Sequence, residues 1–87
     1  MKIKYFGVLR QKTGAAEQEG SGATIREVLE NACSGNEALR SAILDGNRLQ
    51  PYVRVMVNGI DIEMADGLAT AVSDRDQIAI FPPIAGG

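Results

Sequence analysis

The chain begins with an alternation of apolar and polar residues. A period of two is typical of a strand with one buried face, so residues 2–9 are expected to form a strand. The positions on the inner phase are Ile3, Tyr5 and Leu9, and two lysines take the other phase. The sequence Lys-Thr-Gly at 12–14 then predicts a turn, and the short polar segment 15–19 predicts a return strand.

A helical period follows the Gly-Ser-Gly at 20–22. Thr24 and Glu27 stand in capping-box spacing, in which each side chain satisfies a backbone N–H at the start of a helix. Apolar residues then recur on one face and Gly35 ends the pattern, which predicts an amphipathic helix. The residues of this stripe are Ile25, Val28, Leu29, Ala32 and Cys33. A shorter helix is expected over 37–44, with Asn36 as its cap and Asp-Gly at 45–46 as its stop.

The second half of the chain returns to a period of two. Valines at 53, 55 and 57 alternate with Arg54 and Met56, and Asn58-Gly59 suits a tight hairpin turn into residues 60–62. The last alternation, with Ile78 and Ile80 inward, predicts a final strand that ends at Phe81.

The predicted order is hairpin, helix, hairpin, strand. One sheet covered on one face by a helix is the economical way to bury these elements, and a single long crossover favours a mixed sheet. We therefore expect an α+β fold of the β-grasp type, with four to five strands packed on one main helix and a shorter second helix. Residues 1–81 would form this domain, and residues 82–87 a flexible C-terminal tail.

Composition narrows the function classes. The chain has 87 residues, of which 45% are hydrophobic and 23% are charged, so it suits one small soluble domain without a deep enclosed cavity. The net charge is −2 and the basic residues are scattered, which argues against nucleic acid as a partner. No stretch has the length of a membrane span or the pattern of a secretory signal, so a cytoplasmic location is expected.

Catalytic and metal-binding residue types are scarce. Histidine is absent and Cys33 is the only cysteine, which removes Ser-His or Cys-His catalysis, paired zinc ligands and an internal disulfide. Cys33 lies on the apolar stripe of the main helix, so it is expected to act as a small core residue. The sequence predicts no bound metal and no bound cofactor.

The candidate chemistry lies at the end of the chain. Two prolines end the last strand and direct the tail away from the sheet. Gly86 and Gly87 have no Cβ, so the terminal backbone could enter a channel too narrow for other residues. The reactive group would be the terminal carboxylate of Gly87, which needs activation by a partner that consumes ATP. A frayed terminus is the structural alternative.

These residues closely resemble the small subunit of molybdopterin synthase, that is, the MoaD-like sulfur carriers of the ubiquitin-like β-grasp family. The segments that carry the resemblance are Phe81-Pro82-Pro83-Ile84-Ala85-Gly86-Gly87, the stretch Tyr52 to Gly59, Lys4 to Gly7, Thr24 to Leu29 and Asp76 to Phe81. The likeness therefore spans the whole chain, and the tail is its most specific part.

The resemblance implies a cycle of activation and sulfur transfer. A ubiquitin-activating-type adenylyltransferase would adenylate Gly87 with ATP, and a sulfurtransferase system would convert it to a thiocarboxylate. The tail would then enter the large subunit of molybdopterin synthase and give its sulfur to a cyclic pyranopterin. By this resemblance Gly87 bears the sulfur and Gly86 gives access. The chain would be a carrier, without catalysis of its own.

The alternation also predicts a docking surface. Phe6, Val8, Met56 and Phe81 fall on the phase opposite the core, and Arg54 lies beside them. If the first, third and last strands are neighbours, these residues form an exposed apolar patch next to the tail. The tail residues Pro82, Pro83, Ile84 and Ala85 would extend this partner-binding surface. The alternative is that a helix or a loop covers Phe6 or Phe81.

Other functions use the same features. A ubiquitin-like protein modifier would present the same activated Gly87 to a lysine amine, and a carrier for another sulfur metabolite would present the same thiocarboxylate. A purely structural interaction domain would not need Gly86 and Gly87 at all. The sequence leaves these alternatives open.

Overall fold

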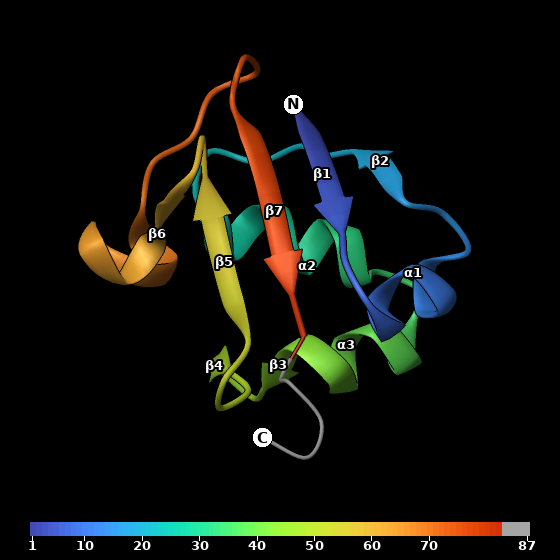
Figure 1. The fold of residues 1–87 in the computed structure, drawn as a ribbon. Coiled ribbons are helices and arrows are strands. Elements are labelled where there is room, and N and C mark those ends of the chain that lie inside the picture. The colour runs from blue at the N-terminus through green and yellow to red at the C-terminus, as the bar shows by residue number, and fades with distance from the viewer. Residues whose placement is uncertain (83–87) are drawn as a thin grey trace.

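A mixed five-stranded sheet forms the centre of the molecule, and the computed structural model describes residues 1–82. The strand order is β2-β1-β7-β5-β6 (Figure 1). β1 and β7 pair in parallel, and the other neighbours pair antiparallel. The bounds are β1 (Lys2–Tyr5), β2 (Glu17–Glu19), β5 (Arg54–Val57), β6 (Ile60–Asp61) and β7 (Gln77–Phe81). The predicted β-grasp architecture is confirmed.

Within residues 1–82, three helices accompany the sheet, whereas the sequence predicts one main and one shorter helix. The longest helix crosses one face of the sheet (Figure 1). The helices are α1 (Val8–Thr13), α2 (Ile25–Cys33) and α3 (Glu37–Ile43). A separate two-stranded hairpin, β3 (Leu44–Asp45) with β4 (Arg48–Leu49), follows α3, and two 3₁₀ turns, η1 (Ile62–Met64) and η2 (Gly67–Ala69), follow β6.

The prediction of one strand over residues 2–9 is wrong in its second half. β1 ends at Tyr5, and Gly7, at φ 59° and ψ −138°, turns the chain into α1. This short helix buries Leu9 and ends at Gly14, whose left-handed conformation lets its N–H donate to the carbonyl of Arg10. The segment at 12–14 is therefore the end of a helix instead of a free turn.

The capping and hairpin predictions are confirmed. The Thr24 side chain accepts a hydrogen bond from the backbone N–H of Glu27, and the Glu27 carboxylate accepts one from the N–H of Ala23. Asn36 caps α3 by accepting from the N–H of Leu39. Asn58 and Gly59 form the turn between β5 and β6. Local side-chain chemistry thus determines where these elements begin.

The core lies between the sheet and α2. Ile3, Tyr5, Val55, Ile78 and Ile80 are fully or almost fully buried on one side of the sheet. From α2 the buried side chains are Ile25, Val28, Leu29 and Cys33. Full burial of an aliphatic side chain contributes roughly 1.5–3 kcal/mol, so this layer accounts for most of the driving force for folding. It also fixes the position of β7, which leads directly to the tail.

The residues that the structure describes include no helix long and apolar enough to cross a membrane. Within the same part of the chain, no group of His, Cys, Asp and Glu side chains is arranged to hold a metal ion.

Candidate functional site

The last strand ends beside the corner that follows the first strand. The N–H of Phe6 donates to the carbonyl of Ile80 at 3.2 Å and so completes the last pair of the parallel ladder between β1 and β7, Tyr5 with Ile80. The rings of Phe6 and Phe81 stack with their centroids 4.4 Å apart and their planes 11° apart. Both side chains are half-buried. The two predicted patch residues that are farthest apart in sequence are therefore in direct contact.

Two arginines flank this aromatic pair. Arg54 on β5 is the register partner of Phe81 and forms an ion pair with Asp61 at 2.9 Å. The Arg10 guanidinium lies over the ring of Phe6, 5.7 Å from its centroid, while its Nε donates to the carbonyl of Tyr5. A cation over an aromatic face is an attractive arrangement. Arg10 therefore places a positive charge on the ring of Phe6, whereas the charge of Arg54 is balanced by Asp61.

Gly7 leaves room for the ring of Pro82. A Cβ built on Gly7 would lie 2.9 Å from Cγ of Pro82, closer than side-chain carbons approach in proteins. Its φ of 59° lies in the region that favours glycine. The corner after β1 therefore packs against Pro82, the first residue after β7.

The other predicted patch residues have different positions. Met56 is the register partner of Ala79 and is half-buried on the same side of the sheet as Arg54. Val8 does not continue the strand after Phe6; it begins α1 and is 53% exposed. The placement of Val8 on the outer face of a strand is wrong, because the strand ends at Tyr5 and Gly7 turns the chain into α1. The predicted patch is half-buried at Phe6, Phe81 and Met56.

Part of the predicted site lies outside the residues that the structure describes. These are Pro83, Ile84, Ala85, Gly86 and Gly87. Pro82 is described and is half-buried. The predicted roles of these residues in partner binding and sulfur attachment stay predictions.

Sequence reasoning missed Gly7 and Arg10. Gly7 interrupts the alternation between Phe6 and Val8, and this interruption was the available signal. Arg10 could not be placed because the helix that carries it was not predicted. Once Val8–Thr13 is a helix, the position of Arg10 near its end brings the guanidinium back over Phe6.

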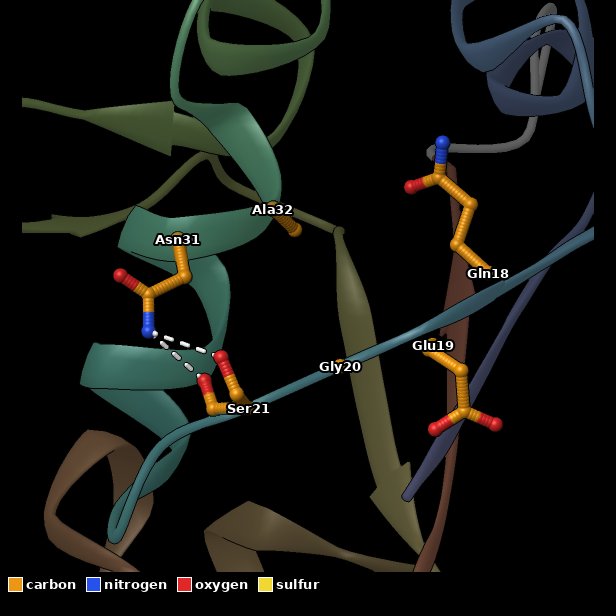
Figure 2. Close-up of a pocket in the computed structure, with 6 residues that line it drawn as sticks. All are labelled: Gln18, Glu19, Gly20, Ser21, Asn31 and Ala32. Carbon is orange, nitrogen blue, oxygen red and sulfur yellow. Dashed lines mark hydrogen bonds between the residues drawn. The ribbon is translucent and has the colours of Figure 1, made fainter.

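A polar hollow lies beside the edge strand β2, at the far edge of the sheet from β5 and Arg54. It has a volume of about 420 Å³ and is lined by Gln18, Glu19, Gly20, Ser21, Asn31 and Ala32 (Figure 2). The amide of Asn31 donates to the carbonyl of Ser21 at 2.8 Å, so the backbone after β2 is tied to α2 (Figure 2). None of the aromatic or basic residues beside the tail lines this hollow.

Buried titratable groups belong to the core. Burial raises the pKa of Cys33, and the side chain is 1% exposed. Burial also raises the pKa of Tyr5 to about 12, and its hydroxyl donates to the Gln18 side chain at 3.0 Å. Both groups stay protonated at neutral pH, which fits the expected structural role of Cys33.

Comparison with known proteins agrees with this arrangement. Residues 3–87 match the model of the ThiS family. The chain is 29% identical over 90 residues to small archaeal modifier protein 3 of Haloferax volcanii, covering 100% of this chain and 98% of that protein. It is 31% identical over 84 residues to the sulfur carrier protein CysO of Mycobacterium tuberculosis, covering 92% of this chain and 90% of that protein.

Solved structures show the same fold over nearly the whole chain. A chain in the Amycolatopsis orientalis BexX/CysO complex superposes with a TM-score of 0.88 at 29% identity, covering 99% of this chain and 98% of that one. A putative molybdopterin converting factor subunit 1 from Pyrococcus furiosus superposes with a TM-score of 0.74 at 27% identity, with 95% of each chain covered.

The fold and the tail sequence define a ubiquitin-like β-grasp protein of the MoaD and ThiS type. The chain belongs to the ThiS family, whose relatives here include sulfur carriers and small protein modifiers.

Proposed function

We propose that this protein carries sulfur as a thiocarboxylate on Gly87 and donates it to a cyclic pyranopterin during molybdopterin synthesis. The observation that supports the proposal most directly is the end of β7. There Phe6 stacks on Phe81 and Gly7 packs against Pro82, so the chain is held in place up to the last described residue before the Gly-Gly end of the sequence. Similarity to sulfur carriers and to a molybdopterin converting factor subunit is further support.

The chemistry begins with an inert group. A carboxylate is a poor acyl donor, so an oxygen of Gly87 must first attack the α-phosphorus of ATP, which releases pyrophosphate and leaves an acyl adenylate. A persulfide sulfur of a sulfurtransferase then attacks the carbonyl and expels AMP. A second thiol cleaves the resulting acyl disulfide, so that the thiocarboxylate and a protein disulfide remain.

Donation of sulfur restores the starting state. The thiocarboxylate sulfur attacks an electrophilic carbon of the pterin precursor and displaces an oxygen substituent from that carbon, so that a thioester joins the carrier to the substrate. Water then cleaves the acyl–sulfur bond, which leaves sulfur on the pterin and the carboxylate on Gly87. The large subunit of molybdopterin synthase would hold both reactants, and the carrier would supply a sulfur atom tethered at high effective concentration.

A protein modifier is the second candidate function. The observation that favours it is the likeness to small archaeal modifier protein 3 over the full length of both chains. In that case a lysine amine attacks the acyl adenylate or a thioester derived from it, and an isopeptide bond forms. A carrier for another sulfur metabolite also fits the likeness to CysO.

The intact mass of the protein isolated from its native cells tests the proposal. An exchange of one oxygen for sulfur at Gly87 is expected, together with molybdopterin formation when the thiocarboxylate form is mixed with the synthase large subunit and a cyclic pyranopterin. A control variant, Met64→Ala, changes an exposed side chain on η1 and should behave like the native protein.

Two results would contradict the proposal. Gly87 found only as carboxylate or in isopeptide bonds with lysine would favour the modifier. A thiocarboxylate that the large subunit does not consume would favour a different sulfur acceptor.

A further inference from the structure

Tyr52 occupies a turn position that normally belongs to glycine. The N–H of Val53 donates to the carbonyl of Gln50, which closes a four-residue turn with Pro51 and Tyr52 at its centre. Proline followed by a residue with positive φ is the pattern of a type II turn, and glycine is the usual residue at the second of these positions. Tyr52 has a φ of 70°. The backbone cost of this conformation is not offset by burial, because the side chain is 85% exposed.

Hydrogen bonds of Gln50 hold the backbone of this turn in place. The side-chain amide of Gln50 donates to the carbonyls of Ser41 and Leu44, and its backbone N–H donates to the carbonyl of Ile43. These bonds join the turn to the end of α3 and the start of β3. The tyrosine ring is therefore presented to solvent from a fixed backbone, and little order remains to be gained when a partner binds it.

The turn lies at the same end of the sheet as the start of the tail. Arg54 is the register partner of Phe81, and Tyr52 precedes Arg54 by two residues. The loop that leads into β5 and the tip of β7 accordingly lie at one end of the molecule (Figure 1). A protein that takes up the tail must close around this end, with Phe6 and Arg10 on the β1 side and Tyr52 on the β5 side.

We propose that Tyr52 is an anchor for the ATP-dependent adenylating enzyme that activates Gly87. The inference rests on the proposed function, but it applies equally to a sulfur carrier and to a modifier, because both need this first step. The expected complement on the enzyme is a shallow apolar pocket bordered by carboxylates. The carboxylates are expected because Arg48, which precedes the turn on β4, is exposed, whereas Arg54, which follows the turn, is already paired with Asp61. Exposed tyrosines at the centre of an interface are frequent hot spots.

A substitution by glycine separates the two properties of Tyr52, which are its exposed ring and its strained backbone. Tyr52→Gly removes the ring and relieves the backbone strain, so a residue with only a structural role would leave activation unchanged or improved. The assay is ATP–pyrophosphate exchange by the cognate adenylating enzyme, with the carrier as the varied substrate. Tm is measured for each variant. Tyr52→Phe keeps the ring, and Met64→Ala removes a side chain of similar exposure, 82%, on η1.

For Tyr52→Gly we expect a Tm equal to or above that of the native protein, and a KM raised by about tenfold or more with little change in kcat. Tyr52→Phe and Met64→Ala should keep the native KM. An unchanged KM for Tyr52→Gly would overturn the inference while the native chain is still activated. If the native chain supports no exchange at all, the proposed function itself fails.

Discussion

Gly7 and Pro82 are in contact although 74 residues separate them, because the parallel pairing of β1 and β7 brings both strand ends together. The space that Gly7 leaves is filled by the proline ring, to within 2.9 Å of where a Cβ would stand. The corner after β1 thus contacts the first residue that follows the last strand.

A side chain at Gly7 should disturb the tail. We expect Gly7→Ala to destabilise the fold by about 1–3 kcal/mol, because φ 59° with ψ −138° is a conformation that side-chain-bearing residues rarely adopt, and in addition to push Pro82 aside. Gly14→Ala is a control with a positive φ of 75° and no heavy atom within 4 Å of the new Cβ. Stability and adenylation kinetics should both suffer more in Gly7→Ala than in the control.

A double-mutant cycle isolates the contact. Pro82→Ala removes the ring carbon that the new Cβ would meet, so Gly7→Ala should cost less in that background than in the native chain. Equal costs in the two backgrounds would show that the Gly7–Pro82 contact has no energetic weight and that only backbone strain matters.

The stack of Phe6 on Phe81 predicts a second effect. Phe81→Ala should destabilise the fold by about 0.5–1.5 kcal/mol, because the aromatic pair is half-buried. It should also raise KM for the partners that receive the tail. Ile60→Ala, at a 60% exposed residue on edge strand β6, is the control. Normal folding and normal sulfur transfer by Phe81→Ala would refute the idea that this surface docks partners.

Much of this arrangement follows from residue patterns. The Asn58-Gly59 turn, the cap at Thr24 and the apolar stripe of α2 are each determined by local chemistry, and each was predicted correctly. The predicted patch depended on the condition that the first, third and last strands are neighbours. The observed order β1-β7-β5 meets this condition and brings Phe6 and Phe81 together.

The failures have a tertiary cause. Leu9 continues the alternation of Ile3 and Tyr5, which suggested a longer strand. A single apolar residue is equally compatible with the buried face of a strand and with that of a six-residue helix. A helix as short as α1 is not stable by itself, so its packing against the rest of the fold decides its formation. The hairpin of β3 and β4 was missed because the Asp45-Gly46 pair is typical both of a hairpin turn and of the end of a helix. Its two strands of two residues each are also too short to show an alternation.

The ion pair of Arg54 with Asp61 predicts a pH dependence. The backbone N–H of Glu63 and then the Arg54 guanidinium hold the pKa of Asp61 below its ordinary value of 3.8. The charged form is therefore favoured by folding. Its contribution is complete above the unfolded pKa and is lost as the pH falls through the lower folded pKa.

A comparison of Asp61→Asn with the native chain tests whether Asp61 stabilises the fold at neutral pH and loses this effect in acid. The asparagine oxygen can still accept from the N–H of Glu63, but the charge opposite Arg54 is gone. At pH 7 the variant should be less stable by about 0.5–1 kcal/mol, as expected of an ion pair whose arginine is largely exposed and whose carboxylate is partly buried. The difference should shrink as the pH is lowered below 4 in thermal unfolding. A difference that grows on acidification would contradict the assignment.

The hydroxyl of Thr24, which caps α2, should contribute measurably to the stability of the fold. Thr24→Ala leaves the N–H of Glu27 without its side-chain acceptor and should cost about 1 kcal/mol, which lowers Tm by about 4–8 °C in a domain of this size. Thr24→Ser keeps the acceptor and should retain most of the stability. Equal losses in the two variants would mean that the methyl group, and not the cap, is responsible.

Cys33 should take no part in sulfur chemistry. Its side chain is 1% exposed, and burial raises its pKa, so the nucleophilic thiolate is scarce in the folded protein. We expect iodoacetamide to label it far more slowly in the native state than in urea. Cys33→Ala should lower stability by about 1 kcal/mol through lost packing and should still accept sulfur at Gly87. Native protein that carries a persulfide on Cys33, or a Cys33→Ala variant that folds but no longer acquires a thiocarboxylate, would instead place the cysteine in the transfer pathway.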